Sequence, residues 1–145
     1  MPNDTAVKFA YPQSLIAETA CWTVQLRPKQ PTLGALVLIC KEPVGTFSAI
    51  SPAAFAELRE VTAGIERMLR SFVAYERINY LMLMMVDPDV HFHVIPRYAG
   101  TRSHFGREFA DAGWPEVPKL AEAVGLEDAQ IVELAASLAA VWRAD

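Results

Sequence analysis

Two of the three histidines in this chain lie two positions apart, in the segment 89–94, which reads Asp-Val-His-Phe-His-Val. In an extended strand alternate side chains point to the same face, so Asp89, His91 and His93 would share one face and apolar side chains the other. An imidazole with its ordinary pKa of about 6.5 can be a nucleophile near neutral pH, or a hydrogen-bond donor to an anion. This segment is therefore where we expect the chemistry of the protein.

Length and composition predict one compact domain. The chain has 145 residues, of which 52% are hydrophobic and 21% are charged, enough to bury a sizeable core. We expect a single domain over 1–145, with an irregular lead-in over 1–20 and a C-terminal helical extension over 116–145. A net charge of −4 argues against broad binding of nucleic acid, which normally needs a basic face.

Three further features bear on location and cofactors. No apolar run approaches the ~20 residues that a membrane span needs, so no membrane association is expected. The first residues lack the pattern of a secretory signal, and Cys21 and Cys40 have neither metal-binding nor redox spacing. We expect a cytoplasmic protein without a cofactor.

Hydrophobic periodicity predicts the strands that must position the histidines. Alternation over 22–26 predicts a half-buried strand, and the apolar run 35–40 predicts a well-covered central one. Residues 80–86 and 90–95 predict two adjoining strands, with a tight turn between them. Residues 100–107 are polar and glycine-containing, so we expect a loop there.

Two helices complete the predicted domain. Ser51 can cap a helix that has Pro52 at its first position, and apolar residues then recur at helical spacing to Phe72. A terminal helix has Ile131, Leu134 and Leu138 on one face. Because the strands lack helical crossovers, the sheet should be antiparallel and the fold class α+β.

The segment around the histidines resembles the motif of the histidine triad (HIT) family, His-φ-His-φ-His-φ-φ, in which φ is apolar. Residues 89–95 match it except that Asp89 stands in place of the first His, and Pro96-Arg97 commonly follow the motif in that family. A second block, 34–44, is similar to the glycine-containing strand of the family, in the order of its fragile-histidine-triad branch. The resemblance spans about residues 22 to 115. It implies a HIT-like antiparallel sheet of about five strands, one long amphipathic helix, a C-terminal helix and a homodimer.

The resemblance also implies a function, that of a nucleotidyl hydrolase or transferase. Such an enzyme cleaves a nucleoside phosphate from a polyphosphate or phosphoramidate partner, and its substrate is a nucleotide or dinucleotide. His91 matches the nucleophile of the family, which forms a nucleotidyl-histidine intermediate. His93 would donate a hydrogen bond to the phosphate oxygens and stabilise the charge that develops on them.

Several positions depart from the family or add to its pattern. We expect Asp89 to turn toward an imidazole N–H and so to modify the imidazoles. The Gly-Gln segment of the family before the triad is absent. Arg27 stands where the family has an Asp or Asn for the ribose hydroxyls, and we expect it to contact the nucleotide or its phosphate. Arg97 and Arg102 could add donors for phosphate. Asn79 could be a turn residue or a ribose contact.

Other interpretations stay open. The protein could bind nucleotides with little turnover, because the first His and the Gly-Gln segment are missing. Alternatively, Asp89, His91 and His93 could bind a metal ion, although alternate residues of a straight strand lie ~6.6 Å apart and converge poorly on one ion. In a random protein such histidines would more often be solvated surface.

Among other residues, we expect surface exposure for His104, a packing role for Trp114, and core packing for Met82, Met84 and Met85.

Overall fold

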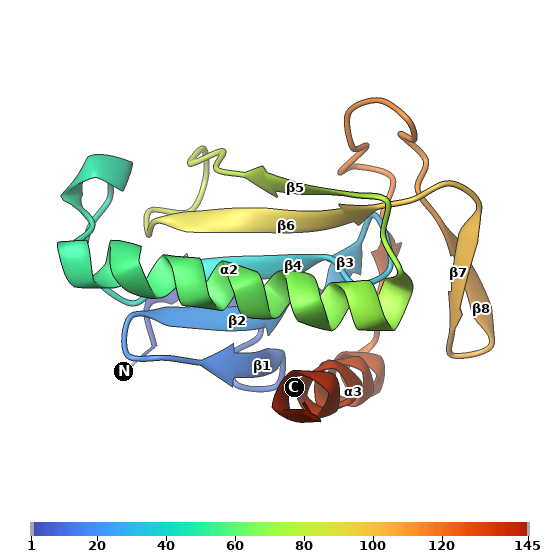
Figure 1. The fold of residues 1–145 in the computed structure, drawn as a ribbon, viewed down its shortest axis with the longest axis horizontal. Helices are drawn as coiled ribbons and strands as arrows, with labels where there is room; N and C mark the ends of the chain where they lie inside the picture. The colour runs from blue at the N-terminus through green and yellow to red at the C-terminus, as the bar shows by residue number, and fades with distance from the viewer. Residues whose placement is uncertain (1, 145) are drawn as a thin grey trace.

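The computed structural model describes residues 2–144 and has at its centre a five-stranded antiparallel sheet with the order β1-β2-β4-β6-β5 (Figure 1). Its strands are β1 (Leu15–Glu18), β2 (Trp22–Leu26), β4 (Leu36–Cys40), β5 (Arg77–Leu81) and β6 (His91–Arg97). Two small antiparallel pairs flank it: β3 (Lys29–Gln30) with β9 (Val124–Gly125), and β7 (Thr101–His104) with β8 (Arg107–Ala110). The helical segments are α1 (Asp4–Lys8), the 3-10 helix η1 (Phe47–Ala49), α2 (Pro52–Val73) and α3 (Asp128–Ala144). The predicted α+β class and antiparallel sheet are confirmed.

Helix α2 begins where its capping signal predicts. The Ser51 side chain accepts a hydrogen bond from the Ala54 amide, and Pro52 is the first helical residue. The helix ends at Val73, and its C-cap residue Ala74 adopts a left-handed conformation (φ 47°) and donates its amide to the Arg70 carbonyl. No helix within residues 2–144 combines the length and the apolar character needed to cross a membrane.

The two faces of the sheet are covered differently. Helices α2 and α3 pack on one face, where the main core includes Trp22, Leu38 and Val94, and Figure 1 shows α2 lying along the front of the sheet. On the opposite face Val37 and Ile39 pack against Ala6 of the short helix α1. The alternation of β4 thus separates a thick helical layer from a thin cover made by the N-terminal segment.

Several expectations about local structure are wrong. Strand β2 is fully buried rather than half-buried. The lead-in 1–20 contains helix α1 and the edge strand β1, and 100–107 contains the hairpin of β7 and β8 rather than a loop. Strand β5 ends at Leu81, and the following segment leaves the extended conformation, with a positive φ of 52° at Met84. Within the extension 116–145 the helix begins only at Asp128. The Met-rich segment is therefore a loop in which Met85 is 84% exposed, while Met82 and Met84 pack on the core.

Gly64 permits the close contact between α2 and α3. A Cβ atom at this position would lie 2.5 Å from Cη2 of Trp142 on α3. We expect Gly64→Val to lower the free energy of unfolding by about 2 kcal/mol, because the added side chain overlaps the indole ring. The matched control is Ala63→Val, an exposed position on the same helix that pays only the cost of β-branching. Chemical denaturation measures both, and equal losses in the two variants would contradict the contact.

Candidate functional site

The two histidines lie on β6, an interior strand between β4 and β5, on the face opposite to the helices. His91 is paired with Ile39 and His93 with Val37 of β4, so their side chains follow the face that α1 covers. The ring centroids are 5.3 Å apart, and the planes meet at 79°. The sheet thus holds two imidazoles side by side at fixed positions.

The hydrogen bonds of the two rings select opposite tautomers. His91 Nδ1 lies 2.7 Å from the Asp89 carbonyl oxygen, which can only accept, so this Nδ1 carries the hydrogen and Nε2 has a free lone pair. His93 Nδ1 lies 3.4 Å from Arg27 Nε, which can only donate, so this Nδ1 accepts and Nε2 carries the hydrogen. One ring can therefore act as a nucleophile while its neighbour donates a hydrogen bond.

The surroundings of His93 keep this imidazole neutral. Burial, the positive charge of Arg27 and the neighbouring His91 together lower the pKa of His93 to about 4, and Asp87 opposes the shift only in part. At neutral pH, His93 is therefore a neutral donor through Nε2 rather than a cation.

Phe9, which follows helix α1, covers both imidazoles. Its ring centroid lies 6.4 Å from that of His91 and 5.9 Å from that of His93. His91 is 2% exposed and His93 is 7% exposed. Both imidazoles are therefore almost fully buried, and Phe9 packs beside each of them.

Polar contacts hold this cover in place. The Asp89 carboxylate accepts from the amide of Thr5 at 3.2 Å and from its hydroxyl at 2.8 Å, and Lys8 pairs with Asp87 at 2.7 Å. The expected turn of the Asp89 carboxylate toward an imidazole is therefore wrong. Asp89 orients His91 through its backbone carbonyl instead.

Arg27 reaches the site from the turn between β2 and β4. The Gln30 side chain donates to the carbonyls of Arg27 and Ala35 and accepts from the amide of Gly34, whose φ of 94° favours glycine. This fixes the backbone from which Arg27 extends to His93. A pocket of about 380 Å³ opens there, and it is lined by Lys8, Phe9, Arg27, Pro28, Lys29, Val86, Asp87 and His93.

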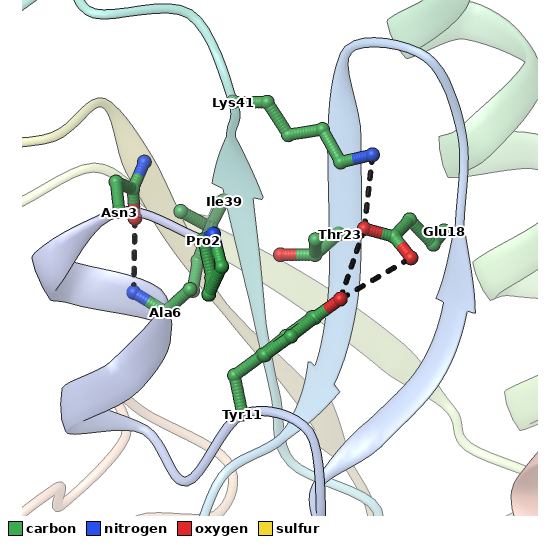
Figure 2. Close-up of a pocket in the computed structure, with 8 residues that line it drawn as sticks. All are labelled: Pro2, Asn3, Ala6, Tyr11, Glu18, Thr23, Ile39 and Lys41. Atoms are coloured by element: carbon green, nitrogen blue, oxygen red, sulfur yellow. Dashed lines mark hydrogen bonds and ion pairs between the residues drawn. The ribbon is translucent and has the colours of Figure 1, made fainter.

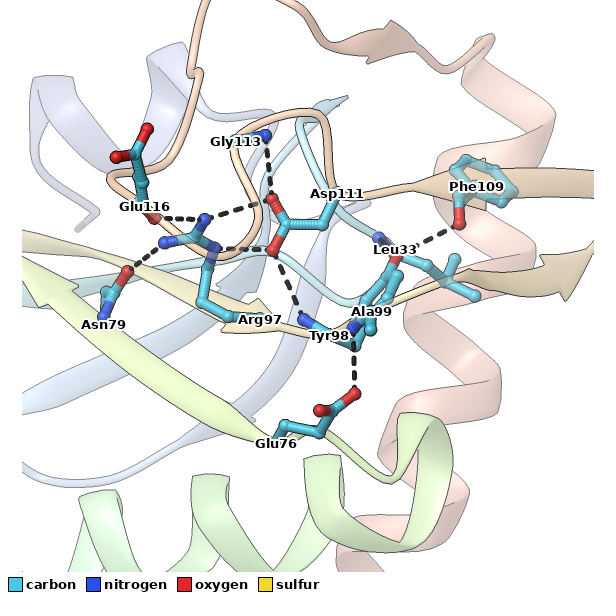
Figure 3. Close-up of polar contacts among 10 residues, drawn as sticks. All are labelled: Leu33, Glu76, Asn79, Arg97, Tyr98, Ala99, Phe109, Asp111, Gly113 and Glu116. Atoms are coloured by element: carbon cyan, nitrogen blue, oxygen red, sulfur yellow. Dashed lines mark hydrogen bonds and ion pairs between the residues drawn. The ribbon is translucent and has the colours of Figure 1, made fainter.

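The prediction that Arg97 helps to bind phosphate is wrong. Arg97 lies on β6 about 13 Å along the strand from His93, at ~3.3 Å per residue. Its buried guanidinium pairs with Asp111 at 2.7 Å and also donates to Asn79 Oδ1 and the Glu116 carbonyl (Figure 3). These bonds tie the loop after β8 to the sheet, so Arg97 has a structural role.

Arg102 and Asn79 also lie apart from the imidazoles. Arg102 donates to the Val73 and Ala74 carbonyls at the end of α2 and lies 4.4 Å from the Tyr98 ring centroid, so its expected phosphate contact is wrong. Asn79 lies on β5, and its oxygen accepts from Arg97. It is a strand residue rather than a turn residue, and it lines a separate open pocket of about 740 Å³ beside Trp114 rather than the pocket at His93. The ribose contact stays a prediction.

Another pocket, of about 290 Å³, lies beside α1 (Figure 2). The Glu18 carboxylate there accepts from Lys41 at 2.9 Å and from the Tyr11 hydroxyl at 3.3 Å. Neither His91 nor His93 lines this pocket, so it is separate from the site at the histidines.

The structure does not assemble the alternative metal site. The Asp89 carboxylate is bonded to Thr5, and residues 2–144 contain no group of three His, Cys, Asp or Glu side chains arranged to hold a metal ion. His104 is only partly exposed, because its ring packs near Phe72 and its Nε2 lies 2.9 Å from a Glu133 carboxylate oxygen.

Sequence reasoning missed the residues that cover and line the site. These are Thr5, Lys8, Phe9, Lys29 and Asp87. A weak signal existed for the first three, because Asn3 is a good N-cap with an acidic residue following it, and it does accept from the Ala6 amide. The family motif covers only the strands, so nothing in it pointed to the N-terminal segment.

Comparisons with known proteins identify the fold. No family model and no curated protein matches the sequence. Among solved structures, a hypothetical histidine triad nucleotide-binding protein from Sulfolobus tokodaii superposes with a TM-score of 0.73 at 15% identity, over 97% of this chain and 90% of the other. A histidine triad protein from Sinorhizobium meliloti gives 0.72 at 18% identity, over 95% and 93%. Diadenosine triphosphate hydrolase from Plasmodium falciparum gives 0.70 at 9% identity, over 92% and 79%. The chain therefore has the histidine triad fold, as predicted.

The cover over the histidines can be tested by chemical modification. We expect Phe9→Ala to increase severalfold the rate at which diethyl pyrocarbonate acylates His91 and His93, because the ring over both imidazoles is removed. Peptide mass spectrometry measures the rate, with the partly exposed His104 as an internal reference. The control is Val7→Ala, an exposed α1 residue that should change nothing. An unchanged rate in Phe9→Ala would show that other groups bury the imidazoles.

The tautomer and charge of His93 can be tested by nuclear magnetic resonance. We expect its ring to titrate with a midpoint near pH 4 and Arg27→Gln to raise that midpoint, because a positive charge is lost. Since the folded pKa lies below the ordinary value, the unfolded state binds more protons between about pH 4 and 6.5, so stability falls as the pH drops through that range. Arg107→Gln, in the hairpin of β7 and β8, is the control. A midpoint near 6.5 in the wild type would contradict the assignment.

Proposed function

We propose that this protein is a nucleotidyl hydrolase or transferase that uses His91 as nucleophile and His93 as hydrogen-bond donor to the reacting phosphate. The observation that carries the proposal is the pair of opposite tautomers on adjacent rings. One nitrogen with a free lone pair and one N–H lie on the same face of β6. Attack on phosphorus needs both of these groups.

The proposed reaction has two steps. His91 Nε2 attacks phosphorus, the bond from phosphorus to the leaving oxygen or nitrogen breaks, and the leaving group departs with the electron pair and takes a proton from solvent. The imidazole becomes positively charged, and its Nδ1–H donates to the Asp89 carbonyl, which stabilises that charge. Water then displaces His91 and releases the nucleotide, or another acceptor takes the nucleotidyl group.

His93 supports the same reaction as a donor. Because its pKa is lowered to about 4, it remains neutral and keeps its Nε2–H available throughout the physiological range. A hydrogen-bond donor placed at an oxygen that gains charge in the transition state stabilises the transition state more than the ground state.

The expected homodimer stays a prediction.

A rapid quench with a dinucleoside polyphosphate or a nucleoside phosphoramidate, followed by mass spectrometry of the intact protein, tests the proposal. We expect a nucleotidyl adduct on the wild type and none on His91→Ala. His93→Ala should slow adduct formation by about 10²- to 10³-fold, the usual cost of losing one donor to the transition state. His104→Ala is the matched control and should react like the wild type.

The same experiment separates the alternatives. No adduct and no turnover with either class of substrate would refute the mechanism, as would turnover by His91→Ala at the wild-type rate. Nucleotide binding without an adduct would instead identify a binding protein with little turnover, the second function considered for this sequence.

A further inference from the structure

The pocket at His93 has an excess of positive charge. Lys8, Arg27 and Lys29 line it, and Asp87 is the one carboxylate among its lining residues. Because Asp87 already pairs with Lys8 at 2.7 Å, two cations remain. A pocket of this size with two remaining positive charges favours an anionic ligand.

Of these two cations, Arg27 gives the stronger indication that the pocket binds an anion. Within residues 2–144 no carboxylate pairs with it, and its Nη1 donates to the Lys29 carbonyl at 2.7 Å while Nε faces His93. Burial lowers the pKa of the guanidinium, as expected for a charge taken out of water without a counter-ion. Such a group is stabilised when a bound anion supplies the missing negative charge.

This anion position is distinct from that of the reacting phosphate. Arg27 meets His93 at Nδ1, whereas the hydrogen bond to the reacting phosphate would come from Nε2, on the opposite edge of the ring. A phosphate held between Nε2 of His91 and Nε2 of His93 therefore lies across the imidazole from Arg27. Lys29 reaches the pocket from the Arg27 side.

We propose that Arg27 and Lys29 bind a second phosphate group of the substrate, separate from the phosphate that His91 attacks. The inference rests on the proposed function and deepens it, because it restricts the substrate to nucleotides that carry at least two phosphate groups. The second group is either a phosphate on the ribose or a further phosphate of the polyphosphate chain. Both present anionic non-bridging phosphate oxygens to a guanidinium.

Isothermal titration calorimetry with matched ligands tests the inference. The probes are adenosine and guanosine 5′-monophosphates, the corresponding 5′-diphosphates, and the 2′,5′- and 3′,5′-bisphosphates, at one fixed salt concentration. We expect at least one doubly phosphorylated ligand to bind about tenfold or more tightly than its monophosphate, as charged hydrogen bonds usually allow. The bisphosphates identify a ribose phosphate, and the diphosphate identifies the polyphosphate chain.

Variants link the effect to the two cations. Arg27→Gln should abolish the preference, and Lys29→Gln, at an exposed position that does not threaten folding, should weaken the preference while leaving monophosphate affinity within about threefold. Arg107→Gln removes an equal charge from β8 and should leave the preference unchanged.

The outcomes separate this inference from the proposed function. Equal affinity for monophosphates and doubly phosphorylated ligands overturns the inference alone, as does a preference that persists in both Arg27→Gln and Lys29→Gln. If none of the nucleotides binds the wild type, the inference and the nucleotide-based function both fail.

Discussion

The pairing of β6 with both β4 and β5 is the constraint on which the site depends. A strand with neighbours on both sides cannot slide by one residue without turning every side chain to the opposite face. The register Ile39 to His91 therefore keeps Phe92 on the helical side, near Trp22, and both imidazoles on the other side. The helical core gives the site its rigidity, although it supplies none of the groups that contact the imidazoles.

Hydrogen bonds to the Asp89 backbone carbonyl and to the Arg27 side chain, rather than to a third histidine, fix the tautomers of the two imidazoles. The Asp89 carbonyl keeps the ring hydrogen of His91 on Nδ1, and Arg27 keeps that of His93 on Nε2. Every residue type has a backbone carbonyl oxygen, so His91 keeps this hydrogen bond although Asp89 stands in place of the first histidine of the motif. The carboxylate that the replacement introduces serves the N-terminal segment instead.

The sequence predicted the elements that depend on local interactions better than those that depend on contacts between residues far apart in the chain. The central strands and α2 were predictable, because alternation and capping are local signals that the sheet and the core reinforce, as in 22–26 and at Ser51. The pairing of the two histidines on one face followed from the same alternation. Helix α1 was missed because five residues carry too little periodicity, and it depends on bonds to distant residues, such as that from Thr5 to Asp89.

Arginines show the limit of sequence reasoning about the site. Arg27, Arg97 and Arg102 were equally plausible phosphate ligands by type, yet only the fold shows that the last two are committed to Asp111 and to the end of α2. A guanidinium forms similar bonds with a carboxylate, a carbonyl or a phosphate, so its residue type does not identify its partner. Burial and the positions of other acceptors decide it, and these depend on residues far apart in the chain.

The hydrogen bonds and the ion pair that attach the N-terminal segment to the β5–β6 loop affect the apparent affinity of any ligand that contacts His91. Because His91 is almost fully buried beside Phe9, a ligand that must displace Phe9 to contact His91 binds with its intrinsic affinity multiplied by the fraction of molecules in which Phe9 is displaced. The bonds from Thr5 and Lys8 to the two loop aspartates set that fraction. Because Lys8 lies on α1, displacing this segment also breaks the ion pair of Lys8 with Asp87 and takes the ammonium away from the pocket. Exposure of the nucleophile is therefore coupled to the loss of one ion pair, and a phosphate that binds the open state shifts the population toward it.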